Sequence, residues 1–456
     1  MKPKLENVPL TSQSTAPNNS FIPMLLIGIL FFVFGFVTWL NGALIPFLKI
    51  ACELNEFEAY LVTFVFYIAY FVMALPTSSI LTKVGYKMGM TLGLGTMAAG
   101  AGLFILAALV GHFASFLVAL FVLGTGLTLL QTAANPYIVC IGPRESAAMR
   151  ISLMGIVNKG AGFIVPILFT AWILTGMEPY SEQALASLTD VQREIALTEL
   201  SNRLVLPYLL MAIVLVGLML FVFYSPLPEP DLGEKVQSSN ADWKAILKYP
   251  QVILGALTLF CYIGVEVIAG DSIGLFSQGL GVAHFGMMTS YTMGFMVIGY
   301  VLGILLIPRV ISQQTALTGS ALAGLGFTLG ILFSDSQSQS VSQFLLAWLG
   351  VLPVPDPVLY LALLGLANAL VWPAVWPLAL QGLGRLTATA SALLIMGIAG
   401  GAILPLLYGY IAHNQGDSQM AYFLLLPCYA MIFYYAVWGH KITAKETQPD
   451  VVALNE

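Results

Sequence analysis

Apolar runs of about 20 residues or more, the length that a helix needs to cross a bilayer, recur along almost the whole chain. They predict twelve transmembrane helices, at 21–48, 58–82, 88–111, 113–141, 151–175, 204–225, 250–276, 285–308, 314–334, 357–382, 386–412 and 420–440. The apolar piece 344–352 is too short to span and is followed by prolines, so we interpret it as an interfacial or re-entrant segment. The pattern predicts an all-α membrane protein.

Polar stretches divide these helices into two equal groups. Residues 226–249 form the one long polar linker, between predicted six-helix bundles at 21–225 and 250–440. A polar stretch precedes the first apolar run, and that run is too long for the apolar region of a cleavable signal sequence, so we expect no signal peptide. We expect residues 1–20 to be a disordered cytoplasmic tail. We expect residues 441–456 to be a second cytoplasmic tail.

A short pattern recurs in the two predicted bundles. Pro136 precedes Arg144 by eight residues, and Pro377 precedes Arg385 by the same spacing. Both pairs lie at the inner end of the fourth helix of their bundle. Coincidence is the alternative in a proline-rich chain, but the matching position favours a duplication. We therefore predict two pseudo-symmetric bundles.

Composition and charge narrow the functional classes. Charged residues make up 9% of the chain, against about 25% in an ordinary soluble domain. A net charge of -5 without a basic cluster gives no support to nucleic-acid binding, and four cysteines are too few for a disulfide scaffold. The sequence shows no metal-ligand cluster and no hydrolase motif. We predict neither an enzyme nor a bound cofactor.

Lysines and arginines are distributed unevenly between alternate loops. With the N-terminus in the cytoplasm, thirteen of the 17 basic residues lie on the cytoplasmic side and three on the outer side. Cytoplasmic loops of membrane proteins are enriched in Lys and Arg. We therefore expect both termini to be cytoplasmic.

Three charged residues lie within the predicted spans. A charge at the centre of a spanning helix costs about 2.5–3.5 kcal/mol on insertion scales, so each is a functional candidate. Glu266 lies deep in the seventh span and Lys159 lies in the fifth, while Asp271 lies nearer the outer end, where we expect it to meet water. The alternatives are a protonated packing role for Glu266 and snorkelling of Lys159 to the interface.

Amide side chains occur in several predicted spans. Asn41 lies in the first span, Gln131 and Asn135 share one face of the fourth because they are four residues apart, and Asn158 lies in the fifth. An amide carries hydrogen-bond donors and an acceptor together, which suits sugar hydroxyls. Amide-mediated packing between helices is the alternative.

The tenth span carries one amide and two indoles in a stripe. Asn368, Trp372 and Trp376 recur every four residues and therefore share a helix face. An indole offers a flat apolar surface on which the C–H face of a pyranose can pack. An interfacial belt position is the alternative, above all for Trp376. Pro373 and Pro377 are expected to kink this helix.

Several sequence blocks resemble a known transporter family. One block, LTKVGYKMG, is similar to the loop motif of the major facilitator superfamily. Thr82 stands where that motif has an acidic residue. Three longer blocks resemble the fucose–galactose–glucose:proton symporter family, and above all its bacterial glucose/galactose and N-acetylglucosamine members. They are WLNGALIPFLK, LLQTAANPYIVCIGPRESAAMRISLMGIVNKGAG and LANALVWPAVWPLALQGLG. The resemblance covers about residues 21–440.

This resemblance implies the major facilitator fold, with a monosaccharide bound between two six-helix bundles. It also implies import driven by protons, or by sodium in one branch of the family. The fucose–proton members carry acidic residues at two positions that are here Gly42 and Gln131. Coupling would therefore have to use Glu266, with Lys159 and Asp271 as further ion-coupling candidates.

The identity of the coupling ion stays open at this point. Sodium prefers oxygen ligands, and Glu266 with helix carbonyls near Gly264 and Gly270 could supply them. A proton would instead bind Glu266 alone, whose ionised form is disfavoured by desolvation.

We therefore predict a bacterial inner-membrane importer of a hexose or N-acetylglucosamine that works by alternating access, as a monomer in the lipid bilayer. The predicted sugar site consists of Asn41, Gln131, Asn135, Asn158, Asn368, Trp372 and Trp376. A drug–proton antiporter of the same fold is one alternative, but it would have fewer amides in its cavity. A non-transporting sugar receptor is another, and it would need a long soluble signalling domain.

Overall fold

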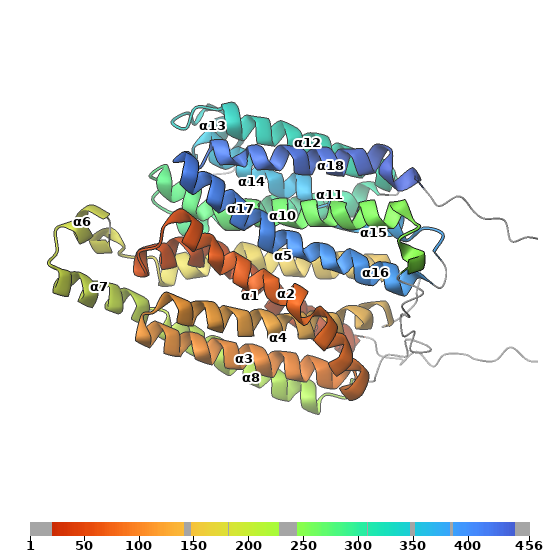
Figure 1. Ribbon diagram of the computed structural model, residues 1–456, viewed down its shortest axis with the longest axis horizontal. Coiled ribbons are helices and arrows are strands. Elements are labelled where there is room, and N and C mark those ends of the chain that lie inside the picture. Colours follow the sequence, from red (N-terminus) through yellow and green to blue (C-terminus); the bar gives the residue numbers. More distant parts are fainter. Residues whose placement is uncertain are drawn as a thin grey trace, which may run out of the picture.

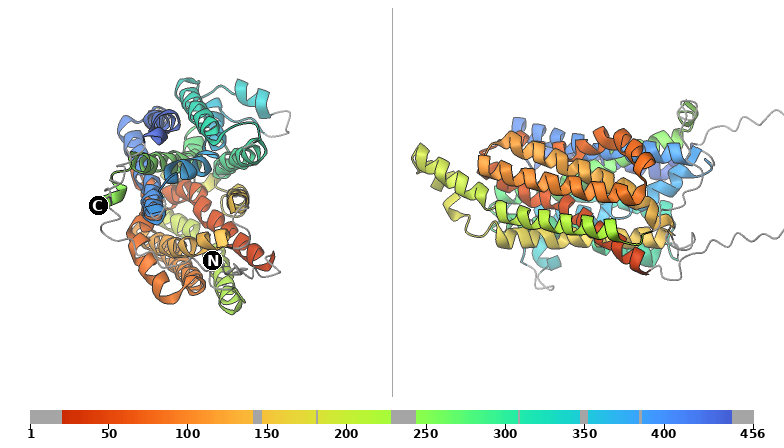
Figure 2. Two further views of the ribbon diagram at one scale, coloured as in Figure 1. Left: turned by 90° about the vertical axis from the view of Figure 1, so that its right-hand side faces the viewer. Right: turned by 90° about the horizontal axis from the view of Figure 1, so that it is seen from below.

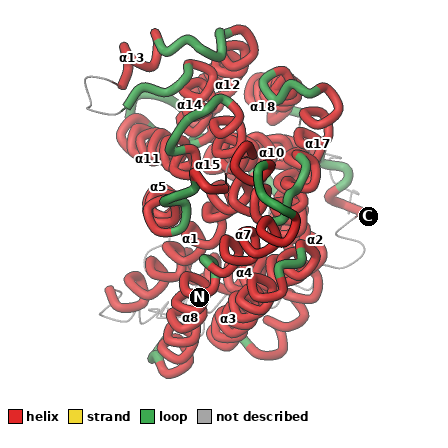
Figure 3. Tube along the Cα trace, turned by 90° about the vertical axis from the view of Figure 1, so that its left-hand side faces the viewer, coloured by secondary structure: helices red, strands yellow, loops and turns green. Residues whose placement is uncertain are grey.

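Of the 456 residues in the chain, the computed structural model describes 21–140, 147–180, 182–227, 244–307, 309–346, 352–383 and 386–442. Within these ranges every regular element is a helix, and no strand occurs (Figure 3). Twelve helical stretches are long and apolar enough to span a membrane. They run roughly parallel to one another (Figures 1 and 2), so the prediction of an all-α membrane protein is confirmed.

The first six spans are α1 (Phe21–Ala51), α2 (Glu56–Val84), α3 (Tyr86–Val110), α4 (Phe113–Cys140), α5 (Ala147–Trp172) and α8 (Val205–Tyr224). The last six are α10 (Pro250–Gly279), α11 (Met288–Leu306), α12 (Gln313–Phe333), α14 (Asp356–Asn368) with α15 (Val371–Leu380), α16 (Thr387–Met396) with α17 (Gly400–Gln415), and α18 (Leu425–Val437). Shorter elements connect them: η2 (Glu178–Tyr180), α6 (Glu182–Ala186), α7 (Asp190–Asn202), η3 (Phe285–Met287), α13 (Ser340–Leu346), η6 (Gly397–Ala399), η7 (Met420–Leu424) and η8 (Gly439–Lys441).

The helix packing of the first half repeats in the second half. In the first half, α1 packs on α5, α2 on α4, and α3 on both α4 and α8. The corresponding helices of the second half pack in the same way: α10 on α17, α11 on α14, and α12 on both α14 and α18. The two bundles are therefore pseudo-symmetric. Arg144 and Arg385, whose spacing predicted this, lie outside the described residues.

The main contacts between the bundles come from three helix pairs: α1 packs on α10, α2 on α17, and α5 on α11 (Figure 1). Exchanging the halves converts the second pair into the third and the first into itself, so the interface follows the same two-fold relation. Glycines allow the closest approach. A Cβ at Gly42 would lie 2.6 Å from the Gly270 carbonyl oxygen, and one at Gly274 would lie 2.7 Å from the Gly42 carbonyl oxygen.

A helix that the sequence analysis did not predict precedes the sixth span. In α7, Thr189 and Gln192 form a capping box, and Arg193 pairs with Glu53 beside the end of α1. The helical stretch Asp190–Tyr224 is therefore longer than the predicted span 204–225, and α7 extends past the end of the bundle (Figures 1 and 2). A search for apolar runs does not detect so polar a helix.

The tenth span is interrupted where its prolines are expected to disturb it. Helix α14 ends at Asn368 and α15 begins at Val371. Pro373 has no N–H for the carbonyl of Ala369, and its ring would clash with that carbonyl. The break therefore lies about one turn before this proline, while Pro377 lies inside α15.

Helix α13 contains the beginning of the predicted interfacial segment 344–352. The Asp356 carboxylate ties it to the tenth span, since it accepts the Ser338 hydroxyl at 2.5 Å and the Ser342 N–H at 2.9 Å. Residues 347–351 lie outside the described residues, as do the predicted N-terminal tail, most of the linker and most of the C-terminal tail.

Candidate functional site

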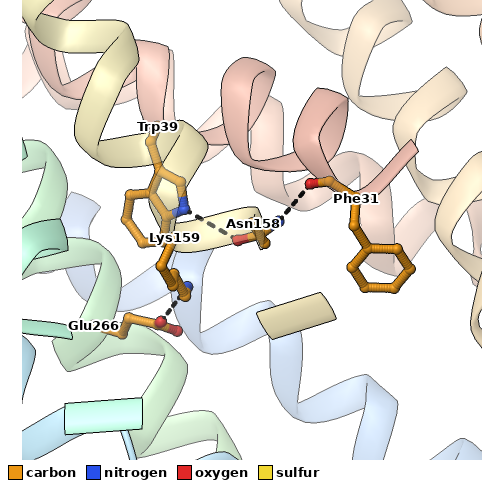
Figure 4. A network of polar contacts seen from close by, with 5 residues as sticks. All are labelled: Phe31, Trp39, Asn158, Lys159 and Glu266. Atoms are coloured by element: carbon orange, nitrogen blue, oxygen red, sulfur yellow. Dashed lines mark hydrogen bonds and ion pairs between the residues drawn. The ribbon is translucent and has the colours of Figure 1, made fainter. Parts of the chain in front are cut away.

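A buried ion pair joins the two bundles between α5 and α10. Lys159 Nζ lies 2.6 Å from Glu266 Oε1 (Figure 4), and the two side chains are only 11% and 7% exposed. The ammonium also lies 4.3 Å from the centre of the Trp39 indole on α1, which is within cation–π range. Lys159 therefore does not snorkel to the interface, and Glu266 is not an isolated packing acid.

Trp39 and Asn158 extend this network within the first bundle. Trp39 Nε1 donates to Asn158 Oδ1 at 3.4 Å, and Asn158 Nδ2 donates to the Phe31 carbonyl at 3.4 Å (Figure 4). Helices α1 and α5 approach closely because Gly35 has no side chain where the Asn158 backbone lies. Asn158 is thus oriented by α1, next to the ion pair.

Trp39 is a central residue that the sequence analysis missed. A Cβ at Gly270 of α10 would lie 2.5 Å from its ring, and a Cβ at Gly162 of α5 would lie 2.6 Å from it. The indole therefore occupies the space where α1, α5 and α10 meet. Its position two residues before Asn41, in the block WLNG, was the available signal.

Two indoles of the predicted stripe form an aromatic pair in α15. The ring centroids of Trp372 and Trp376 lie 5.4 Å apart, and the Tyr262 ring of α10 lies 6.3 Å from Trp372. Both indoles are partly exposed. Trp376 Nε1 is buried and has no hydrogen-bond acceptor among the described residues. The pair offers aromatic surface and an indole donor to a ligand.

Asn368 lies on the other side of the helix break from this pair. It is fully buried, and its Oδ1 accepts the Tyr429 hydroxyl of α18 at 2.8 Å. That bond lies within the second bundle and corresponds to the packing alternative. Its Nδ2, however, is buried without an acceptor in the part of the chain that is described.

The other predicted amides differ in burial. Asn41 is buried in α1, and its Nδ2 finds no acceptor among the described residues. Gln131 is partly buried and Asn135 is exposed. No hydrogen bond between described residues links these three to the network around Lys159.

Asp271 is buried, and the expectation that it meets water was wrong. Its exposure is 0%. Thr63 of α2 donates its hydroxyl to Oδ2 at 2.8 Å, a contact between residues 208 positions apart in the chain. The other oxygen, Oδ1, is buried with no partner among the described residues. The expectation failed because α1, α17 and η3 pack on α10, and Thr63 of α2 reaches the carboxylate.

The arrangement gives no support to a sodium site around Glu266, which was one of the two alternatives for coupling. Helix α10 continues without a break past Gly264 and Gly270, and the Gly270 carbonyl accepts the Thr289 hydroxyl at 2.8 Å. Gly264 provides space for Leu404. No group of three or more His, Cys, Asp or Glu that could hold a metal ion occurs among the described residues.

Comparison with known proteins identifies transporters, not enzymes. Residues 27–405 match the Major Facilitator Superfamily. The chain is 32% identical over 441 residues to the glucose/galactose transporter of Brucella abortus, covering 95% of this chain and 98% of that one. It is 27% identical over 423 residues to the L-fucose-proton symporter of Escherichia coli, covering 91% and 92%.

Solved structures agree with this match. The crystal structure of the transporter FucP in the outward conformation has a TM-score of 0.68 at 26% identity, over 91% of this chain and 98% of that one. The structure of a D-xylose-proton symporter has a TM-score of 0.63 at 14% identity, over 92% and 98%, and shows the same fold. The resemblance noted in the sequence blocks is thereby confirmed.

Proposed function

The chain belongs to the Major Facilitator Superfamily, and from this premise we propose that it imports a monosaccharide together with protons by alternating access. Its relatives are named as sugar transporters, and two of them as proton symporters. Glucose and galactose are the first candidate substrates, with N-acetylglucosamine next. The proton is preferred to sodium because two of the relatives are named L-fucose-proton symporters.

The aromatic pair of α15 is the observation that carries the sugar assignment. Trp372 and Trp376 present partly exposed indole surface inside a membrane-spanning helix, where a pyranose can pack its C–H face. Asn41, Asn368 and Trp376 each hold a buried nitrogen donor without an acceptor among the described residues. Buried donors normally have a partner, and sugar hydroxyls can accept from such groups. Gln131, Asn135 and Asn158 complete the proposed lining.

We propose that the bundles at 21–225 and 250–440 are the moving parts, linked through 226–249. Cross-bundle contacts gather where α1 ends and α2 begins: Ser418 donates to Glu56 at 3.1 Å, and the rings of Tyr60 and Tyr408 lie 5.4 Å apart. We place both termini in the cytoplasm of a bacterial cell, with the protein as a monomer in the inner membrane. In that orientation these contacts close the outer side.

Purified protein in liposomes tests this proposal. Radiolabelled glucose, galactose, N-acetylglucosamine and fucose are offered under a pH gradient, under a sodium gradient and without a gradient. We expect exchange of at least one hexose and its accumulation under the pH gradient alone. Failure to exchange any sugar of the panel would refute the sugar assignment, and accumulation under the sodium gradient alone would refute proton coupling.

A further inference from the structure

Three acidic side chains among the described residues are buried, and their surroundings differ. Glu266 has the Lys159 ammonium beside it. Asp356 receives a hydroxyl on one oxygen and a backbone N–H on the other. Asp271 receives a single bond, from Thr63, and forms no ion pair within the described part of the chain. Its carboxyl group is therefore the least compensated of the three.

Among the described residues, no cation of the elements around Asp271 forms an ion pair with it. Helix α1 contributes Gly42 and α11 contributes Thr289 to the crossing beside it. The titratable side chains that lie nearest on these elements are Tyr60 and Tyr67 of α2, Tyr408 of α17 and Tyr422 of η7, with the acids Glu56 of α2 and Glu266 of α10. The basic side chains of the same elements, Lys49 of α1, Lys83 of α2 and His413 of α17, lie in their last turns and form no ion pair with Asp271. An ionised carboxylate at this position would be buried without a countercharge, which is costly.

We propose that Asp271 carries the co-transported proton and that the bundles close over it only when it is a neutral acid. This rests on the proposed function and names its coupling residue. When the bundles separate and the bond between Thr63 and Asp271 breaks, water can reach the carboxylate, which binds a proton from the outer solution. Closure then buries the neutral acid. Because closure favours the protonated form, protonation favours closure to the same extent.

Glu266 is a poorer proton carrier because of its partner. Protonation of Glu266 would leave the Lys159 ammonium buried without its counterion, and breaking such a pair is strongly unfavourable. The pair lies five residues nearer the start of α10 than Asp271, about 7.5 Å along the helix axis. Glu266 is the next acidic residue of α10 toward the proposed cytoplasmic side. The proton is released on that side.

Sugar-driven proton movement in liposomes tests the assignment. A pH-sensitive dye is enclosed, D-glucose is added outside, and acidification of the lumen is recorded beside equilibrium exchange of radiolabelled D-glucose. For Asp271→Asn, we expect exchange within about two-fold of wild type and proton influx reduced about ten-fold or more. Asp356→Asn is the matched control, a buried acid outside the bundle interface, and it should retain proton influx. Equal influx in Asp271→Asn and wild type would overturn the proposal.

Asp271→Glu keeps the test decisive if the Asn variant does not fold. A glutamate retains a titratable carboxyl, so sugar-linked proton influx should persist. Loss of influx in a Glu variant that still exchanges sugar would count against the proposal. Failure of the proposed function and failure of the Asp271 assignment give different results. Absence of sugar exchange in the wild-type protein refutes the transport function, whereas persistent coupling in Asp271→Asn refutes only the role of Asp271.

Discussion

Glu266 and Asp271 lie on one helix but face different neighbours. Five residues of α-helix correspond to a rotation of about 500°, so the two side chains point about 140° apart. Glu266 meets Lys159 of α5, and Asp271 meets Thr63 of α2. Among the described residues, the first acid is paired with a cation and the second is not. Helical rotation within one span thus directs one acid to a cation on α5 and the other to a hydroxyl on α2.

Breaking the ion pair should have the largest effect. Lys159→Met keeps the side-chain stem but leaves Glu266 buried without a cation, so we expect a loss of about 3–5 kcal/mol in the free energy of unfolding. Denaturant unfolding in detergent measures it, and exchange should fall with it. The double variant Lys159→Met/Glu266→Gln should recover much of the stability. Normal stability and transport in Lys159→Met would show that the pair is dispensable.

Substitutions in the aromatic pair should lower the sugar affinity without changing proton coupling, which we assign to an acid of α10. Trp372→Ala and Trp376→Ala each remove a ring of the aromatic pair and should weaken sugar binding by about 1–3 kcal/mol. The number of protons moved per sugar should stay unchanged, because neither acid is altered. Calorimetric titration gives the affinity. Trp172→Ala, at an exposed tryptophan of α5, is the matched control. Unaltered affinity in both variants would remove the pair from the sugar site.

Trp39→Phe probes the support of the paired acid. It keeps a ring face for the Lys159 ammonium and removes the long hydrogen bond to Asn158. We expect a loss of about 1–3 kcal/mol in stability, because the hydrogen bond is lost and the smaller ring leaves a cavity at this buried position. A parallel measurement on Lys159→Met should show a larger loss. If Trp39→Phe is the more damaging of the two, the indole and not the ion pair holds the bundles together.

The smallest change in the free energy of unfolding is expected for an exposed ion pair. Arg193 and Glu53 are 44% and 43% exposed, so water screens their attraction. Glu53→Gln should change the free energy of unfolding by about 0–1 kcal/mol, and less at high salt. Thermal unfolding at low and high ionic strength checks this. A loss comparable to that of Lys159→Met would contradict the importance of burial.

The sequence alone predicted most of the architecture because the residues of a membrane span must be mostly apolar to lie in lipid. An apolar run of sufficient length must be a spanning helix in lipid, so the number of spans and the prolines that interrupt the tenth were available from local sequence. Helix α7 was missed since its polar sequence carries no such signal. Glu266 and Lys159 were found because charges are rare in spans.

Only the tertiary structure decided which partner each of these side chains has. The pairing of Lys159 with Glu266 and the hydrogen bond from Thr63 to Asp271 join residues 107 and 208 positions apart. Trp39 gained its place through glycines on two other helices, and Asn368 was turned toward α18. The sequence of a span shows which side chains lie in the membrane. The energy of a buried charge, however, depends on the side chain that faces it from a neighbouring helix. That group is set by the packing of the bundles.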